Sequence, residues 1–284
     1  MNSIFFLLLK LYARLPMGLL QIIGVKLSLL LHIVGYRKKV VDSNLKKAFP
    51  QKDKASRRKI RMRFYSYFGQ LLAESISLFH MSKKEIRKRF LLVNDSQLSS
   101  YLKQNKDVIV VLGHYGNWEW GLLASSLHFD AEMVGIYKPL SSKFWNQKIL
   151  QIRSQFGATL ISMKDSVRYL LKKGKKPKLI GILSDQTPSA DELNHWINFL
   201  NQKTAVFLGT EKLAKKKDCP VFFAHIKVLS RGNYEIRFEL ITDTPRELAD
   251  GEITRLHSQI LEDNINRNPA YWLWSHRRWK HQQK

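Results

Sequence analysis

The 284-residue sequence contains a single cysteine, Cys219. One thiol cannot form an intramolecular disulfide, and it excludes a zinc site built from several cysteines. The lack of further cysteines also favours a reducing compartment. Because Cys219 opens an apolar run that continues through Phe223, we predict that it is a buried structural residue rather than a nucleophile.

Acidic residues are scarce: 23 Asp and Glu stand against 48 Lys and Arg, which gives a formal net charge of +25. Such an excess of positive charge predicts anionic partners. An acidic membrane surface, an acidic carrier protein and nucleic acid all meet this condition, and charge alone does not choose among them. The basic residues are spread along the chain and no nucleic-acid-binding motif is present, so we do not expect nucleic acid as a partner.

An uninterrupted apolar run of bilayer-spanning length is also missing, since Lys26 divides the longest one, residues 15–35. A cleavable signal peptide fits poorly, because the start is not basic and no small-residue cleavage pattern follows. A basic collar at residues 37–39 comes directly after the apolar stretch. We therefore predict that residues 1–40 are a retained membrane anchor that either spans the bilayer or lies in its interface. The alternative is a buried helix of a soluble protein.

The rest of the chain, residues 41–284, is predicted to form one catalytic domain. Apolar residues recur near the helical period over residues 41–92, which predicts a helical lead-in. In residues 93–284, short apolar runs alternate with helical stretches, which predicts an α/β core with a mixed, mostly parallel sheet flanked by helices. The expected strands are 108–112, 133–137, 159–162, 179–183, 196–200, 221–229 and 234–241, the last two forming a hairpin, and the expected helices are 118–127, 144–156, 166–173 and 247–266.

The segment most suggestive of chemistry follows the first of these strands. The strand ends at Gly113, a loop with glycines on both sides carries His114, and Asn117 is well suited to cap the next helix. Active sites of α/β sheets collect at the carboxyl ends of strands. A histidine followed by a glutamate is usually a structural pair, and this context raises the case for a catalytic role without excluding the structural one.

Glu119 is the nearest carboxylate to His114 in the sequence. On one continuous helix, residues five positions apart point about 140° away from each other. With His114 in the loop and Glu119 in the first helical turn, the imidazole can fold back against the carboxylate. We therefore predict a His114/Glu119 dyad in which Glu119 stabilises the imidazolium while the other ring nitrogen takes a proton from an alcohol.

The surroundings of this dyad limit the chemistry further. No nearby serine or cysteine is placed as a nucleophile, so we expect direct attack by the alcohol without a covalent enzyme intermediate. The dyad offers one histidine and one carboxylate, whereas a catalytic zinc takes three protein ligands. We therefore expect no metal and no cofactor.

The run Gly113-His114-Tyr115-Gly116-Asn117-Trp118-Glu119 resembles the His-x4-Asp/Glu motif of the bacterial lipid A secondary acyltransferases, the late lauroyl and myristoyl transferases, within the wider glycerolipid acyltransferase superfamily. The blocks Tyr137-Lys138-Pro139, Gly157-Ala158 and Ser184-Asp185-Gln186 and the closing segment, residues 269–280, extend the resemblance to the whole chain. Lys138 replaces the arginine usual in the family, which retains the charge but loses a two-pronged anion contact.

The resemblance implies an O-acyltransferase at the cytoplasmic side of the cell inner membrane. The donor would be acyl carrier protein or acyl-CoA, and the acceptor a hydroxyl of an anionic lipid A precursor. We count Asn117, Lys138, Arg153 and Asp185 as substrate-binding residues beside the catalytic pair, with turn capping as the alternative role of Asp185.

Two other functions stay open. The same dyad would serve an acyltransferase for a lysophospholipid or an amino-acid-containing lipid. In the second alternative, the chain is a non-catalytic, basic, membrane-tethered binding protein.

Overall fold

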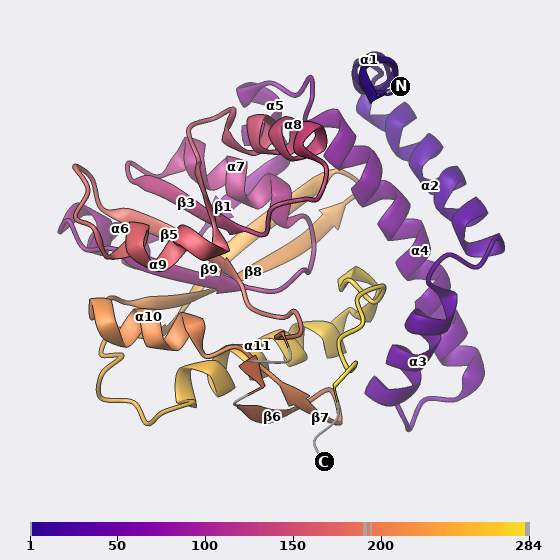
Figure 1. Cartoon of the computed structure of the whole chain (residues 1–284). Helices are drawn as coiled ribbons and strands as arrows, with labels where there is room; N and C mark the ends of the chain where they lie inside the picture. The colour runs from indigo at the N-terminus through magenta and orange to yellow at the C-terminus, as the bar shows by residue number, and fades with distance from the viewer. Residues whose placement is uncertain (1, 190–191, 194, 282–284) are drawn as a thin grey trace.

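The computed structural model of the chain describes residues 2–189, 192–193 and 195–281. Within these residues one seven-stranded sheet has the order β1-β9-β8-β2-β5-β3-β4, and a separate hairpin pairs β6 with β7 (Figure 1). Neighbouring strands of the large sheet are parallel except β8 and β9. The predicted fold class, a mixed and mostly parallel sheet flanked by helices, is confirmed.

The strands are β1 (Phe90–Val93), β2 (Val108–Leu112), β3 (Glu132–Tyr137), β4 (Thr159–Ser162), β5 (Lys178–Leu183), β6 (Trp196–Phe199), β7 (Gln202–Ala205), β8 (Val221–Ser230) and β9 (Asn233–Thr242). The helices are α1 (Asn2–Ala13), α2 (Met17–Ile33), α3 (Lys38–Ala48), α4 (Lys54–Ser77), α5 (Lys83–Arg89), α6 (Ser96–Lys103), α7 (Trp118–His128), α8 (Lys143–Ser154), α9 (Met163–Leu171), α10 (Gly209–Lys217), α11 (Glu252–Arg267) and the short 3₁₀ helix η2 (Pro269–Tyr271).

Strand β2 shows why the sheet is covered on both faces. Val108 and Val110 belong to one hydrophobic cluster, which includes residues of α6 and α7. Ile109 and Val111 belong to a second cluster, which includes residues of α10 and α11. Successive side chains of a strand point to opposite faces, so an unbroken apolar run is typical of a strand with helices on both sides. The carboxyl end of β2 is thus held rigidly in the middle of the molecule.

The helical lead-in expected over residues 41–92 ends earlier than predicted. Phe90–Val93 forms strand β1 and pairs in parallel with Tyr234–Arg237 of β9. A four-residue apolar run has no periodicity that separates helix from strand, so the local pattern could not show this. The distant partner strand decides the structure here.

Helix α2 packs on α4 through a close crossing of small residues. At Gly24 and Gly69 the two backbones come so near that a Cβ atom at either position would overlap the carbonyl oxygen of the other. Glycines at a crossing let two helices approach at backbone distance. Figure 1 shows α2 lying along α4 at one side of the sheet. Helix α2 is thus packed into the body of the protein as well as exposed on one face.

Among the described residues, no single helix is both long enough and apolar enough to cross a bilayer. Helices α2 and α3 meet these criteria only as a pair, with a bend of 88° between them. The outward sides of α1 and α2 nevertheless carry many exposed apolar side chains. We call this surface the N-terminal apolar face; it consists of Ile4, Phe5, Leu7, Leu8, Leu11, Leu19, Ile22, Ile23, Leu27, Leu29, Leu30 and Ile33.

Candidate active site

His114 lies in the loop that joins β2 to α7, as predicted. The glycines beside it are required by the space available. A Cβ atom at Gly113 would lie 2.6 Å from a methyl carbon of Leu261, and Gly116 has a φ of +66°, which L-residues with side chains rarely adopt. Asn117 caps α7, as predicted, because its side-chain oxygen accepts a hydrogen bond from the Trp120 amide at 3.0 Å. Together these features fix the course of the loop.

The imidazole of His114 is paired with Asp185. Nδ1 of His114 lies 2.6 Å from Oδ1 of Asp185, and the backbone N–H of His114 donates to Oδ2 at 2.8 Å. Asp185 follows β5, which is the parallel neighbour of β2. The carboxyl ends of the two strands therefore meet at one edge of the sheet. The partner predicted for the imidazole, Glu119, was wrong, because spatial adjacency of strands decides this contact and sequence proximity does not.

Asp185 is built to accept hydrogen bonds as a carboxylate. It is buried, and the indole Nε1–H of Trp272 donates to Oδ2 at 2.8 Å, beside the two contacts from His114. Burial alone would raise the pKa of Asp185, but the attraction of His114 and these hydrogen bonds hold that pKa below its ordinary value. An ionised Asp185 places the imidazole proton on Nδ1.

The other ring nitrogen of His114, Nε2, is consequently left with a lone pair. Nε2 lies 3.2 Å from the side-chain nitrogen of Gln186, which can only donate a hydrogen bond. The side chain of His114 keeps 12% of its surface exposed, whereas that of Asp185 keeps 3%. The arrangement therefore suits a base, with a buried orienting carboxylate on one side of the ring and a nitrogen that contacts the exposed Gln186 side chain on the other.

Glu119 instead forms an ion pair with Arg153. Glu119 lies in the first turn of α7 and Arg153 in the last turn of α8, and the guanidinium makes a two-pronged contact with the carboxylate, Nε to Oε2 at 2.7 Å and NH2 to Oε1. Burial lowers the pKa of Arg153, but the hydrogen bonds to Glu119 outweigh it and leave that pKa raised. The pair joins α8 to the helix that follows the His114 loop.

Two of the expected substrate-binding residues lie at very different places. Asn117 is fully buried, its oxygen caps α7 and its amide donates to Glu74 at 2.7 Å, so the structure corrects the expectation that it contacts substrate. Lys138 is exposed and directly follows β3 at the carboxyl edge of the sheet. It adjoins Tyr137, which lines a groove of about 300 Å³ beside α9. The role of Lys138 in binding an anionic group stays a prediction.

The closing segment, residues 269–280, packs against the loop that carries His114. The Leu273 amide donates to the carbonyl of His114 and the Gly116 amide to the carbonyl of Tyr271, both at 3.1 Å. Trp272 and Trp274 are 2% and 0% exposed, so both tryptophans pack in the core. Sequence reasoning found neither the contact of Trp272 with Asp185 nor the one of Gln186 with His114, and only the position of Gln186 beside Asp185 could have signalled the second.

Cys219 is buried at 3% exposure, and burial raises the pKa of its thiol to about 12. A thiol with so high a pKa is a poor nucleophile at neutral pH. The prediction of a structural cysteine is confirmed.

Known proteins resemble this chain over nearly its whole length. Residues 1–281 match a family model described as bacterial lipid A biosynthesis acyltransferase. The chain is 22% identical over 275 residues to the lipid A biosynthesis palmitoleoyltransferase of Escherichia coli (strain K12), and the match covers 96% of this chain and 88% of that protein. The lipid A biosynthesis acyltransferase of Shigella flexneri matches with the same identity and coverage.

Proposed function

The chain belongs to the bacterial lipid A biosynthesis acyltransferase family and is an O-acyltransferase, and we propose that it moves a fatty acyl chain from a thioester donor to a hydroxyl of a lipid A precursor. The observation that carries this proposal is the imidazole of His114, whose Nδ1 is held by the buried carboxylate of Asp185 while its Nε2 contacts the exposed side chain of Gln186. An alcohol acceptor needs a base of this kind. The alternative of a non-catalytic binding protein was wrong.

The proposed reaction is a direct transfer. Nε2 of His114 takes the proton of the acceptor hydroxyl while that oxygen attacks the thioester carbonyl. Asp185 stabilises the imidazolium that forms. When the tetrahedral intermediate collapses, the carbon–sulfur bond breaks and the imidazolium returns its proton to the departing thiolate, so the products are an ester and a thiol. Gln186 has no nucleophilic atom, and both oxygens of the buried Asp185 are occupied by hydrogen bonds with His114 and Trp272, which supports a reaction without an acyl-enzyme.

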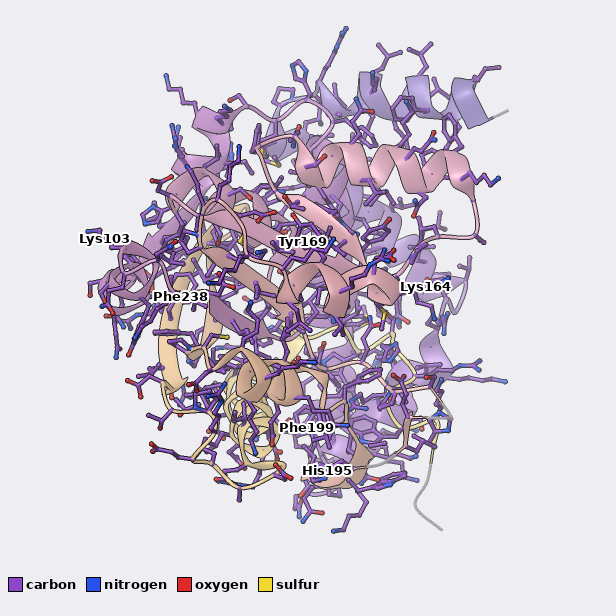
Figure 2. The ribbon with its side chains drawn as sticks, turned by 60° about the vertical axis from the view of Figure 1, so that its left-hand side comes forward. Lys103, Lys164, Tyr169, His195, Phe199 and Phe238 are labelled. Carbon is purple, nitrogen blue, oxygen red and sulfur yellow. The ribbon has the colours of Figure 1, made fainter. Side chains whose placement is uncertain are left out.

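We propose acyl carrier protein or acyl-CoA as the donor, because both present a thioester on an anionic carrier and the chain has a net charge of +25. Lys103 and Lys164 lie on opposite sides of the view in Figure 2, so basic side chains are not confined to one edge of the molecule. Their distribution therefore favours general attraction to anionic partners. Lys138, at the carboxyl edge of the sheet, is the expected site residue best placed to meet an anionic group there.

Lipid analysis of a deletion strain would identify the acceptor. We expect lipids from a deletion strain to lack one acyl chain on lipid A, and the complemented strain to regain it, as measured by mass spectrometry. Transfer of labelled acyl groups by the purified protein should show the same acceptor. A normal lipid A profile in the deletion strain, together with a missing phospholipid or amino-acid-containing lipid, would identify one of the other acceptors.

Glu119 is proposed to act by holding Arg153 rather than by touching the imidazole. Glu119→Gln should lower kcat by about tenfold, because a small misplacement near the site is costly. It should leave the acid limb of the pH–rate profile unmoved, since the charge of Glu119 is already paired with Arg153. Arg153→Lys, which breaks the same two-pronged contact, serves as the matched variant. A shift of the acid limb to lower pH in Glu119→Gln would show that Glu119 stabilises the imidazolium after all.

We propose that residues 1–40 hold the protein at the cytoplasmic side of the inner membrane through the N-terminal apolar face. The support is the exposure of this face and the many cations around it. In vesicle flotation, Leu8→Asp/Leu30→Asp should bind anionic vesicles far more weakly than the parent protein, while Lys103→Asp/Lys106→Asp, distant in the sequence, should change binding less. Recovery of the parent protein entirely in the soluble fraction at low salt would contradict the anchor.

A further inference from the structure

Glu74 is a carboxylate with no exposed surface, and in the described part of the chain its hydrogen-bond partners include no cationic side chain. It lies on α4, near the crossing with α2. Oε1 accepts hydrogen bonds from Gln21 at 3.1 Å and from Gln70 at 2.9 Å. Oε2 accepts from Asn117 at 2.7 Å and from the Tyr234 hydroxyl at 2.6 Å. Four donors from α2, α4, the α7 cap and β9 therefore converge on one side chain.

The four donors determine the charge of this group. Burial raises the pKa of Glu74 above its ordinary value, and the hydrogen bonds from Tyr234, Gln70, Asn117 and Gln21 offset only part of that rise. The three amide groups and the hydroxyl fill both oxygens as donors, and a carboxylate is acceptor-only when ionised. The arrangement thus fits a buried anion. A buried charge of this type is weak evidence for added stability, and fixing one geometry is a better-supported use for it.

One of these contacts reaches the catalytic loop. The four-residue loop from His114 to Asn117 is fixed at its first residue by Asp185 and at its last by Glu74. Between them, Gly116 has a positive φ and its amide donates to the closing segment. Without the Glu74 contact, the side-chain amide of Asn117 would lose its acceptor, and the cap of α7 and the closing segment would be left to hold this end of the loop.

A second contact leads to the apolar N-terminal region. Gln21 lies in α2, the helix that also forms part of the N-terminal apolar face and that crosses α4 at Gly24 and Gly69. Glu74 is the common acceptor of Gln21 and Asn117. We infer that Glu74 is a positioning residue of the acyl-transfer site. Because Gln21 and Asn117 share Glu74 as acceptor, the packing of α2 against α4 helps to hold the His114 loop. This inference rests on the proposed function.

The closing experiment is a reciprocal exchange in the full-length protein, with labelled acyl transfer as the assay and thermal melting as the check of folding. Glu74→Gln places an amide against four donors, and Asn117→Asp places a second carboxylate against Glu74. Each should lower kcat by about 10- to 100-fold with KM changed much less. The double variant restores an amide–carboxylate contact with reversed polarity, and the carboxylate introduced by Asn117→Asp can still cap α7. We expect the kcat of the double variant to be at least tenfold higher than that of the less active single variant.

Two further variants separate positioning from stability. Glu211 is another buried carboxylate, which accepts hydrogen bonds from Gly251 and Thr254 away from the loop, so Glu211→Gln should lower the melting temperature without lowering kcat. Asn117→Ser keeps a capping oxygen but removes the donor to Glu74, and it should lower kcat about tenfold even if Glu74→Gln fails to fold. Gln21→Glu tests the link to α2 and should also lower kcat.

The outcomes distinguish this inference from the proposed function. If His114→Ala abolishes transfer while folded Asn117→Ser or Glu74→Gln keeps parental kcat, Glu74 is not a positioning residue and the function stands. Absence of rescue in a folded double variant would also overturn the direct link. If His114→Ala itself keeps transfer, the proposed function fails first.

Discussion

Replacing His114 with alanine is expected to lower the turnover of acyl transfer by about 10²- to 10⁴-fold, the usual contribution of a positioned general base. The acceptor hydroxyl ionises far above neutral pH, so without Nε2 to take its proton its attack on a thioester is slow. Labelled transfer from acyl carrier protein or acyl-CoA to a lipid acceptor measures the effect.

Folding and membrane binding of His114→Ala should be unchanged. The side chain of His114 lies at the edge of the site and is partly exposed. The hydrogen bond from the backbone N–H of residue 114 to Asp185 remains after the substitution. His128→Ala is a suitable control, because His128 also pairs with an aspartate, Asp95, but at the surface. Near-parental transfer by a well-folded His114→Ala would place the chemistry elsewhere in the molecule.

A loss on the order of 10⁴-fold is expected for Asp185→Asn, by analogy with asparagine in the third position of a catalytic triad. The reason is that the substitution changes the tautomer of the His114 imidazole. Oδ2 of Asp185 accepts from both the His114 amide and the Trp272 indole, so the single oxygen of asparagine belongs there. Its amide nitrogen then faces Nδ1 of His114 as a donor and moves the ring proton to Nε2, which removes the base.

The comparison of Asp185→Asn with Glu119→Gln decides which carboxylate supports the imidazole. The structure predicts a much greater loss in the first variant. Trp272→Phe removes one donor to Oδ2 without changing the charge, and it should lose far less activity than Asp185→Asn. If Asp185→Asn were nearly as active as the parent while Glu119→Gln was inactive, the pairing seen here would not be the catalytic one.

Much of the fold was predictable from the sequence because the strands around the site carry strong local signals. The runs at residues 108–112 and 159–162 form strands with the bounds expected, and the hairpin of β8 and β9 turns where predicted. β1 and β7 were missed, because Phe90–Val93 directly follows a helix and Gln202–Ala205 is mostly polar, so neither stands out as a separate short apolar run. Their structure depends on partner strands that the local sequence does not reveal.

The site, like the fold, was predictable where its signals are local in the sequence. His114 and the capping role of Asn117 follow from the strand–glycine–helix pattern, which is local. The contact of His114 with Asp185 is set by the pairing of β2 with β5, 71 positions apart in the sequence. Glu119 is closer to His114 in the sequence, so the local pattern predicts it as the partner. Sequence distance cannot rank such alternatives when the strand order is unknown.

The contact between Trp272 and Asp185 has a consequence for the order of events during translation. Trp272 follows Asp185 by 87 positions, and Asn44 of α3 donates to the carbonyl of Trp274, 230 positions later. When the loops after β2 and β5 have emerged from the ribosome, the closing segment, residues 269–280, has still to be synthesised. The apolar N-terminal helices have emerged well before either. If residues 1–40 bind a membrane as proposed, they can do so before the catalytic site is assembled, and a chain that ends before Trp272 would lack the segment that packs against the His114 loop.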